Sequence, residues 1–372
     1  MSLRVVITGG HHTGTLPVIG ELRKRGVKDL YWFGHKFSIE GDKNPTLEFR
    51  EITALGIPFF NLKAGKFYKT RDVIRLLKIP LGVVHALILL LRIKPDVILS
   101  FGGYIAAPTV VAGWLLGIPS VTHEQTAVTG YANNVISKFA KKILVTWEES
   151  KDYFPADKVV VSGLPLREEI FESQTNRLKL NPNLPTIYIT AGKTGSNTIN
   201  RVVGKALPQL LSFANVLHQC GDTSFSNDYE MLVRKHSEVS NAAGEYNLRK
   251  FVMADEIGEF FSKADLIVGR SGAHTVCEIL ALEKPALLIP IPWVSHNEQH
   301  RNAEVIKSRG LGEILKQVDL NEDSLATEIR KMLQNLPKYK LEDNSLKFRH
   351  KDAATIIVNE TLAVAKRKTD IQ

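Results

Sequence analysis

Cysteine is scarce in this chain of 372 residues: Cys220 and Cys277 are its only two, and they lie far apart. Two cysteines at this separation exclude a disulfide framework and have no metal-like spacing. A reducing, cytosolic setting therefore fits the composition best. No basic segment followed by an apolar run and a cleavage site precedes the first strand pattern, so we expect no secretory signal.

Long apolar runs are also absent. The longest, residues 79–93, falls short of the roughly 20 apolar residues that cross a bilayer. Basic residues surround it, since the segment from Lys63 to Lys94 holds eight Lys or Arg residues and a single acid, Asp72. This pattern is typical of a helix that lies on an anionic membrane surface, and equally of a buried helix beside a solvated basic loop.

Acidic residues are in deficit, with 39 against 48 basic residues and a net charge of +9. Such an excess favours anionic partners, namely nucleic acid, anionic lipid or phosphorylated substrates. No nucleic-acid recognition motif accompanies it, so nucleic acid is not an expected partner. No strand pattern ends in an acidic pair of the D-x-D type, so we expect no metal at a diphosphate and no other cofactor.

The chain does contain two series of apolar, β-branched segments that alternate with helical patterns. The first series of expected strands comprises residues 4–8, 30–33, 59–62, 97–100, 120–122, 143–146 and 159–162. The second comprises residues 187–190, 216–219, 249–253, 266–268, 286–290 and 313–316. Continuous apolar strands separated by helices predict parallel sheets that are covered on both faces.

A polar break at residues 173–185 separates the two series. At 372 residues the chain also exceeds the size at which one core normally splits into domains. We therefore predict an α/β fold with two doubly wound, Rossmann-like domains, residues 1–165 and 166–345. Residues 346–372 are expected to form a final helix that returns toward the first domain, and a short tail.

Each series opens with a strand, a Gly-rich turn and a helix. Such a turn presents backbone N–H groups and a positive helix end to a phosphate. The first turn carries His11 and His12, and an imidazole can act as a general base on a hydroxyl. The second turn, residues 190–196, contains GKT but lacks the upstream glycine of a Walker A motif. It suits a diphosphate cradle that Thr194 and Lys193 assist, although both turns are equally compatible with ordinary strand–helix connections.

A third cluster, residues 270–278, follows another expected strand. Ser271 is expected to be the N-cap of the next helix, and Glu278 lies about two turns into it. A carboxylate there can accept both hydroxyls of a ribose, although a solvated helical Glu is the commoner case. The polar segment 292–303 downstream offers many groups that could bind a sugar.

Five motifs occur in one order along the chain: PDVILSFGGYIAAP (95–108), GIPSVTHEQ (117–125), SGLPLR (162–167), RSGAHTVCE (270–278) and HNEQHRNA (296–303). On these motifs the chain resembles the MurG family of glycosyltransferases, from about Arg4 to Lys316. The resemblance implies a GT-B fold, in which an acceptor domain and a donor domain face one another across a cleft. It also implies metal-independent, inverting transfer of GlcNAc from UDP-GlcNAc to a polyprenyl-pyrophosphate-linked muramyl peptide in peptidoglycan synthesis.

The resemblance also implies the site residues. The expected donor-binding residues, including those of the Gly-rich turns, are Gly10, His11, His12, Thr13, Thr126, Arg167, Gly192, Lys193, Thr194, Phe251, Val252, Ser271, Gly272, Ala273, His274, Thr275, Glu278 and Gln299. The expected acceptor-binding residues are Gly102, Gly103, Tyr104, His123, Glu124 and Asn133.

Within the donor set, Arg167 would contact the phosphate or uridine, and Val252 would offer its N–H and C=O to the uracil beside Phe251. Glu278 would hold the ribose and Gln299 the GlcNAc ring. The family docks on membranes, which favours an anionic membrane surface as partner of the segment from Lys63 to Lys94. We therefore expect a peripheral protein at the cytoplasmic face of the cell membrane.

The chain departs from the family at three positions. The family's first loop, GGTGGH, would place its histidine at Gly14, whereas the imidazoles here lie two and three residues earlier. His12 is therefore the first candidate base, His11 the second and Glu124 the third. Lys193 replaces a serine of the family's second loop, and Thr126 replaces an asparagine.

Other interpretations remain open from the sequence. They are a GT-B transferase with another polyprenyl or glycolipid acceptor, a UDP-GlcNAc epimerase, and a non-catalytic binder of such ligands.

Overall fold

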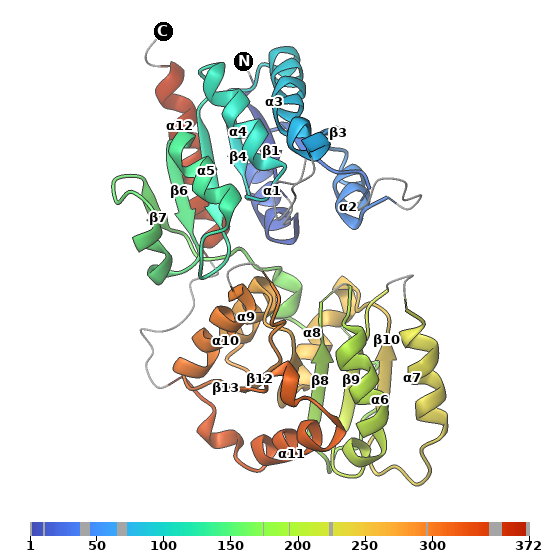
Figure 1. The fold of residues 1–372 in the computed structure, drawn as a ribbon. Coiled ribbons are helices and arrows are strands. Elements are labelled where there is room, and N and C mark those ends of the chain that lie inside the picture. Colours follow the sequence, from blue (N-terminus) through green and yellow to red (C-terminus); the bar gives the residue numbers. More distant parts are fainter. Residues whose placement is uncertain are drawn as a thin grey trace. The chain divides into compact units, whose positions relative to one another are not determined.

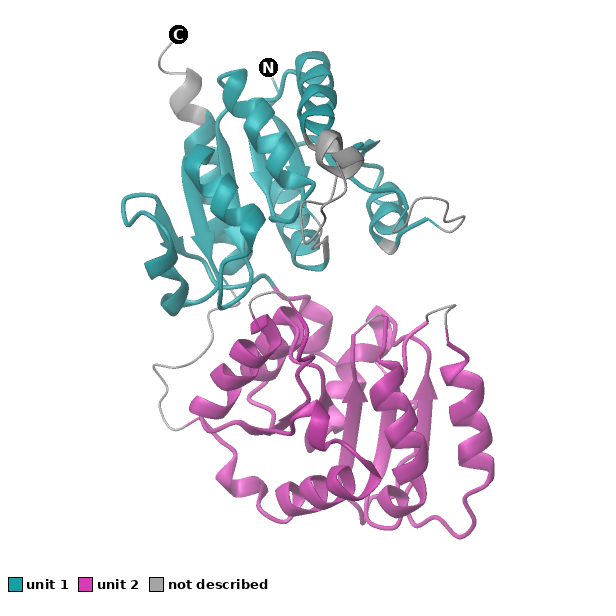
Figure 2. Ribbon diagram, in the orientation of Figure 1, with its two compact units in different colours: residues 1–165, 349–372 teal, residues 166–348 magenta. Residues whose placement is uncertain are grey.

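The computed structural model describes residues 2–9, 12–37, 45–64, 73–173, 175–192, 194–222, 226–294, 297–341 and 352–369; the side chains of residues 12, 47, 73–79 and 366–369 lie outside this description. The chain divides into two compact units, which are described one at a time. Unit 1 comprises Met1–Pro165 and Arg349–Gln372, and unit 2 comprises Leu166–Phe348 (Figure 2).

Unit 1 is built on a parallel sheet in the order β3-β2-β1-β4-β5-β6-β7. Its strands are β1 (Arg4–Thr8), β2 (Asp29–Gly34), β3 (Phe59–Asn61), β4 (Val97–Ser100), β5 (Ser120–Glu124), β6 (Lys142–Val145) and β7 (Val159–Val161). Its α-helices are α1 (Thr15–Lys24), α2 (Leu47–Ala54), α3 (Val73–Ile93), α4 (Ala106–Leu115), α5 (Tyr131–Phe139) and α12 (Ala353–Thr369).

The apolar residues of β1 alternate between the two faces of this sheet. Val5 and Ile7 belong to a core cluster with residues of α1 and α12, whereas Val6 belongs to a second cluster with residues of α3, α4 and α5. Successive side chains of a strand point to opposite faces, so a sheet buried on both sides needs apolar residues throughout. Figure 1 shows α12 in red within the unit that the first half of the chain forms, and it packs there against α1.

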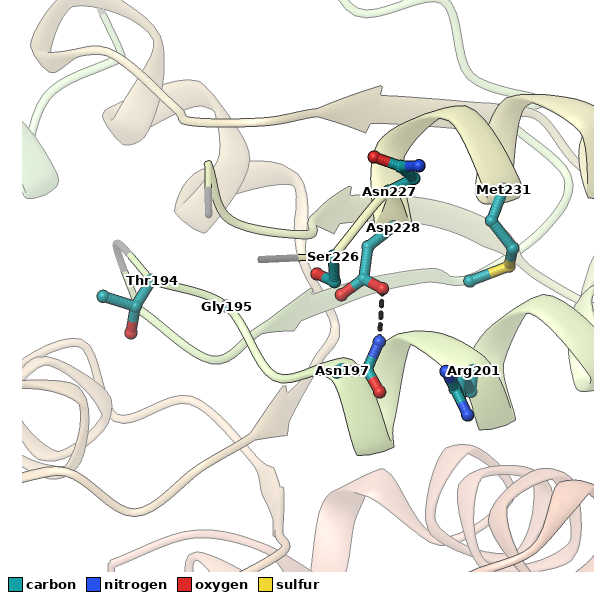
Figure 3. Close-up of a pocket in the computed structure, with 8 residues that line it drawn as sticks. All are labelled: Thr194, Gly195, Asn197, Arg201, Ser226, Asn227, Asp228 and Met231. Carbon is teal, nitrogen blue, oxygen red and sulfur yellow. Dashed lines mark hydrogen bonds between the residues drawn. The ribbon is translucent and has the colours of Figure 1, made fainter. Parts of the chain in front are cut away.

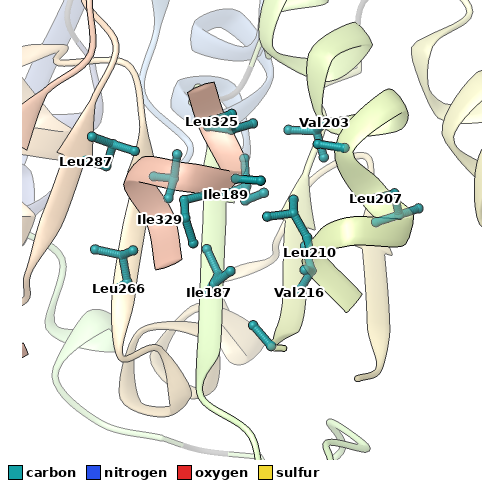
Figure 4. Close-up of a cluster of buried hydrophobic side chains, with 14 of the residues drawn as sticks. Ile187, Ile189, Val203, Leu207, Leu210, Val216, Leu266, Leu287, Leu325 and Ile329 are labelled. Carbon is teal, nitrogen blue, oxygen red and sulfur yellow. The ribbon is translucent and has the colours of Figure 1, made fainter. Parts of the chain in front are cut away.

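Unit 2 has a second parallel sheet in the order β10-β9-β8-β11-β12-β13. Its strands are β8 (Thr186–Thr190), β9 (Asn215–Gln219), β10 (Tyr246–Arg249), β11 (Leu266–Gly269), β12 (Ala286–Leu288) and β13 (Gly312–Ile314). Its α-helices are α6 (Asn197–Leu211), α7 (Asp228–Ser237), α8 (Ala254–Lys263), α9 (Ala273–Ala281), α10 (Glu298–Ser308) and α11 (Glu322–Leu333). In Figure 4, Ile187 and Ile189 of β8 lie in one cluster with side chains of α6 and α11.

The predicted fold class is confirmed, because both sheets are wholly parallel and helices alternate with the strands. One predicted strand is wrong. Residues 249–253 were expected to be extended, but β10 ends at Arg249, so that Phe251 and Val252 lie in the loop before α8. The buried Tyr246 and the partly buried Leu248 are the alternating apolar residues that pack this edge strand against its neighbours.

Two features of the architecture direct attention to ligand sites. Strand order reverses beside β1 in unit 1 and beside β8 in unit 2. In open parallel sheets, ligands bind outside the carboxyl ends of the strands at such switch points.

Of the helices in the described residues, none combines the length and the apolar character that a membrane span requires.

Candidate functional site

In unit 2, the carboxyl ends of β8 and β11 lie side by side at the switch point. After β8 the chain turns through Gly192 (φ +73°) and Gly195 (φ +68°) into α6. A Cβ atom on Gly195 would lie 1.8 Å from the carbonyl oxygen of Cys220. Only glycine combines this left-handed conformation with such a close approach. The turn is thereby held against the end of β9.

The helix that follows β11 begins without a side-chain cap. The sequence suggests Ser271 as the N-cap, but the N-cap is Gly272, which makes no side-chain cap hydrogen bond. Ser271 precedes that N-cap, and its buried hydroxyl donates to the carbonyl of Gln299 at 2.7 Å. The positive end of this nine-residue helix is therefore available to an anion at Ala273, His274 and Thr275.

Arg270 is the most informative residue of this site, and the sequence analysis did not include it among the site residues. Its side chain is only 6% exposed. It donates to the carbonyl of Ile289 at 2.8 Å and to the Ser196 hydroxyl at 2.9 Å, while its Nε has no partner. Burial lowers the pKa of Arg270 to about 10. Among the described residues no carboxylate pairs with it, so a buried positive charge lies uncompensated beside the start of α9.

Arg167 and Glu278 come together at the same site. The Arg167 guanidinium lies 3.5 Å from the Glu278 carboxylate, and both side chains are partly buried. These residues are 111 positions apart in sequence. An arginine held by a carboxylate keeps donor groups fixed in direction, which suits the binding of phosphate or hydroxyl oxygens.

Val252 is placed differently from the expectation. Its N–H donates to the Oε1 atom of Gln219 at 3.0 Å, so this N–H is already used within the chain. The residue is buried next to Phe251, in the loop after β10. The side chain of Gln299 is also hydrogen-bonded within the chain, because its Oε1 accepts the N–H of Ile291 at 3.0 Å.

Thr194 and Gly195 line one side of a cavity of about 660 Å³ whose other wall includes Asn227, Asp228 and Met231. Figure 3 shows the Asp228 carboxylate facing Asn197, whose amide donates to it at 2.6 Å. Lys193, which the sequence places in the same turn, lies outside the described residues.

In unit 1, the loops after β1 and β4 lie at the other switch point. Gly102 (φ +70°) and Gly103 (φ +82°) carry the chain away from β4 in a left-handed conformation. A Cβ atom on Gly102 would lie 2.8 Å from the Asn133 amide. Gly10 and His11 lie outside the described residues, whereas the short 3-10 helix His12–Gly14, which contains Thr13, follows β1 directly.

Glu124 is the hub of a buried polar network at the end of β5. Its Oε1 accepts the N–H and the hydroxyl of Thr126 at 3.1 and 2.9 Å. Its Oε2 accepts the N–H of Gly130 at 3.3 Å and the amide of Asn133 at 2.8 Å. Three N–H donors thus bind this carboxylate, together with a hydroxyl whose single proton also points to the Val128 carbonyl. The arrangement therefore favours a structural role for Glu124 over a role as base.

The other expected acceptor residues lie around this network. The His123 ring is buried, bonds the Gly163 carbonyl through Nε2 at 2.9 Å and lies 5.7 Å from the Phe101 ring. The Tyr104 ring lies 5.1 Å from that of His35. Asn133 thus contacts both Glu124 and Gly102, while His123 bonds to the loop at Gly163.

Models of two domains match the chain. The N-terminal domain of glycosyltransferase family 28 matches residues 3–145, and the C-terminal domain of that family matches residues 186–357. A protein of Legionella pneumophila named UDP-N-acetylglucosamine--N-acetylmuramyl-(pentapeptide) pyrophosphoryl-undecaprenol N-acetylglucosamine transferase is 31% identical over 388 residues, which cover 100% of this chain and 99% of the relative.

The chain belongs to glycosyltransferase family 28. It is accordingly a glycosyltransferase, and the resemblance that its motifs indicate is confirmed.

Solved structures of similar fold match this chain over nearly its whole length. The crystal structure of Acinetobacter baumannii MurG matches with a TM-score of 0.70 at 24% identity and covers 97% of this chain and 99% of that one. A UDP-GlcNAc 2-epimerase from Neisseria meningitidis, bound to UDP-GlcNAc, matches with a TM-score of 0.67 at 17% identity and covers 98% and 100%. The fold is therefore shared by this family 28 chain and by enzymes of another activity.

Metal-ligating clusters are not found in the part of the chain that the structure describes, where no three His, Cys, Asp or Glu side chains gather in a suitable group.

A further titratable group of this family 28 chain lies beside the expected acceptor residue Tyr104. Glu48 of α2 is 8% exposed and accepts the indole N–H of Trp32 at 2.6 Å. Burial raises the pKa of Glu48 from 4.5 to about 7, although the Trp32 hydrogen bond opposes the shift. Burial and then the charge of Glu48 raise the pKa of Tyr104 to about 12.

Glu48→Gln is expected to remove a pH dependence of stability. The carboxyl has a higher pKa in the folded protein than in the unfolded chain. The stability that its protonation contributes is therefore fully present below about pH 4.5 and is lost as the pH rises through 7. The difference corresponds to about 3 kcal/mol. Melting temperatures between pH 4.5 and 8 should show the variant gaining over the unaltered protein as pH rises. Parallel curves would contradict the placement of Glu48.

Proposed function

We propose that this protein transfers GlcNAc from UDP-GlcNAc to the 4-hydroxyl of lipid-linked MurNAc-pentapeptide, with inversion at the anomeric carbon. The name of the Legionella pneumophila relative supports this assignment, as do the motifs of the chain. The observation that carries it is Arg270, a buried guanidinium without a carboxylate partner. Its position beside the uncapped start of α9 suits the diphosphate of a nucleotide sugar.

The reaction is proposed as a single in-line displacement. The acceptor hydroxyl loses its proton to His12 and attacks the anomeric carbon from the face opposite UDP. The departing diphosphate is stabilised by Arg270, by the first N–H groups of α9 and by the turn after β8. Arg167 contacts the phosphate or uridine, and Glu278 accepts the ribose hydroxyls. One displacement converts an α-linked donor into a β-linked product.

No metal takes part in this proposal. The positive charge of Arg270 and the helix start occupy the electrostatic role that a divalent ion has in other transferases. Turnover with the purified protein is expected to persist in excess EDTA, and a strict requirement for magnesium would contradict the assignment.

The acceptor remains to be tested against two alternatives. A transferase with another polyprenyl or glycolipid acceptor would release UDP only with that lipid. An epimerase, whose fold is similar at a TM-score of 0.67, would convert UDP-GlcNAc without any lipid. Purified protein is therefore assayed with labelled UDP-GlcNAc, with and without the muramyl lipid. UDP release that depends on the muramyl lipid supports the proposal, and release or epimerisation without it contradicts the proposal.

We further propose that unit 1 docks on the cytoplasmic face of an anionic membrane. Leu81, Val84, Ile88 and Leu91 of α3 are 51–62% exposed. Their spacing of three and four residues places them on one face of the helix. Trp114 and Leu115 of the neighbouring α4 are also exposed. Clustered exposed apolar side chains mark interaction surfaces, whereas isolated ones need no explanation.

Leu81→Ser combined with Ile88→Ser is expected to weaken binding to anionic lipid vesicles at least about tenfold, because each large side chain contributes on the order of 1.5–3 kcal/mol when buried. Cosedimentation with vesicles measures this change. The matched control is Val318→Ser, which alters an 86% exposed apolar side chain of unit 2. Equal binding by all three proteins would contradict the docking surface. The basic residues Lys66, Lys69 and Arg71 belong to the segment from Lys63 to Lys94 and lie outside the described residues. Their replacement by Glu should release the protein from anionic vesicles in a salt-sensitive manner.

A further inference from the structure

Gln219, the last residue of β9, joins two loops that the proposed donor site uses. Its side chain is 5% exposed. The Oε1 atom accepts the N–H of Val252 at 3.0 Å, and the Nε2 atom donates to the carbonyl of Gly192 at 2.9 Å. A longer contact of 3.5 Å reaches the Thr190 hydroxyl. The loop after β10 and the turn after β8 are therefore linked through one carboxamide.

The chemistry of the link is specific to this side chain. An N–H on one loop needs an acceptor, and a C=O on the other needs a donor. A carboxamide supplies both from one planar group. A carboxylate can serve only the N–H, and an apolar side chain of similar volume serves neither. Val252 is buried and Gly192 is partly buried, so loss of the carboxamide would leave the Val252 N–H unsatisfied and would free the Gly192 carbonyl from the link.

The position of the two loops gives this link a consequence for binding. The loop with Phe251 and Val252 is the proposed contact of the uracil, and the turn with Gly192 and Thr194 is a proposed contact of the diphosphate. The loops follow β10 and β8, which pair with opposite sides of β9 in one sheet. Gln219 at the end of β9 therefore lies between the two loops and bonds to both of them.

We propose that Gln219 is a positioning residue that couples the nucleobase loop to the diphosphate turn, so that the two ends of a uridine diphosphate bind cooperatively. The proposal rests on the proposed function, because it takes a uridine diphosphate as the ligand. It assigns Gln219 no contact with the reacting atoms. Its effect is on donor affinity and not on the chemical step.

The test compares a whole ligand with a part of it. Isothermal titration gives Kd for UDP and for uridine with the full-length protein and with Gln219→Met, which conserves volume and removes both hydrogen bonds. We expect the Kd for UDP to rise about 10- to 100-fold, which corresponds to two hydrogen bonds of ordinary strength. The Kd for uridine should rise less than about threefold. In turnover, KM for UDP-GlcNAc should rise while kcat stays within about threefold.

Two further variants separate positioning from general stability. Gln219→Glu retains the acceptor for Val252 and loses the donor to Gly192, so it should also weaken UDP more than uridine; it serves as the test if Gln219→Met does not fold. Gln209→Met changes an exposed glutamine of α6 and should leave both affinities unchanged. A melting curve accompanies each variant.

Three outcomes decide the matter. Selective loss of UDP affinity supports the coupling role. Equal losses for UDP and uridine, or unchanged affinities in a folded variant, overturn it while leaving the proposed function intact. Failure of the unaltered protein to bind UDP overturns the proposed function, and the coupling role falls with it.

Discussion

Arg270→Met should abolish measurable donor binding and lower turnover by about 10²–10³-fold, the usual effect of removing one charge-stabilising donor from an active site. The guanidinium is buried and its pKa is lowered to about 10 because burial disfavours the charged form. An anion that arrives beside it relieves this penalty, since the charge then has a partner. The expected loss therefore falls on binding of the diphosphate and on its departure.

The same substitution has an unusual expected effect on stability. Methionine has a similar length and carries no charge, so it avoids the cost of a buried, uncompensated cation. This gain is offset by the loss of the hydrogen bonds to Ile289 and Ser196. We expect the melting temperature of the ligand-free protein to be unchanged or higher. A residue needed only for folding would give the opposite result.

The melting temperature measured with and without UDP-GlcNAc tests the effect on donor binding and the effect on stability together. A ligand at 100 times its Kd raises the free energy of unfolding by about 2.7 kcal/mol. UDP-GlcNAc should therefore raise the melting temperature of the unaltered protein and leave that of Arg270→Met unchanged. Arg330→Met is the matched control, because Arg330 is exposed and its guanidinium lies over the Phe213 ring, in a helix outside the proposed donor site. A variant at Arg270 that keeps the full ligand-induced shift would contradict the assignment of this residue.

The strand–helix alternation could be predicted because buried parallel strands have a continuous apolar pattern. Arg4–Thr8 and Val97–Ser100 were predicted to the residue, and both lie in the centre of the sheet of unit 1. The strand Tyr246–Arg249 was misplaced by several residues. It is an edge strand, so only part of its surface is buried and the hydrophobic pattern is weak.

Site residues could be proposed from sequence where one segment carries a motif, and not where distant segments meet. Glu278 was proposed from its position about two turns into a helix. Arg270 was not included, because its significance depends on burial and on a missing carboxylate partner, and neither is visible in sequence. Gln219 has the same character, since its two partners lie 27 and 33 residues away. The Ser271 cap was wrong because the helix begins one residue later, with Gly272 as its N-cap, while the Ser271 hydroxyl donates to the distant Gln299 carbonyl.

His12→Ala is expected to cut turnover by about 10²–10⁴-fold while donor affinity stays close to normal, because a general base contributes to the chemical step and not to binding. His12 begins the short helix that follows β1, at the switch point of unit 1. His11, which lies outside the described residues, is the second candidate. The third, Glu124, already accepts hydrogen bonds from Thr126, Gly130 and Asn133.

Three variants rank these candidates in single-turnover assays with saturating donor. A proton acceptor requires an accessible lone pair, and Glu124 is buried with its carboxylate already bound by three N–H donors. His12→Ala should therefore show the largest loss of rate. It should also lose the fall in rate at acidic pH, which arises because an imidazole base must be neutral to accept a proton. Glu124→Gln should lower acceptor affinity by disturbing the start of α5, which bears Asn133, and should leave that fall in rate in place. Near-normal turnover of His12→Ala with well-bound donor would remove His12 from the role, and loss of the fall at acidic pH only in His11→Ala would transfer the role to His11.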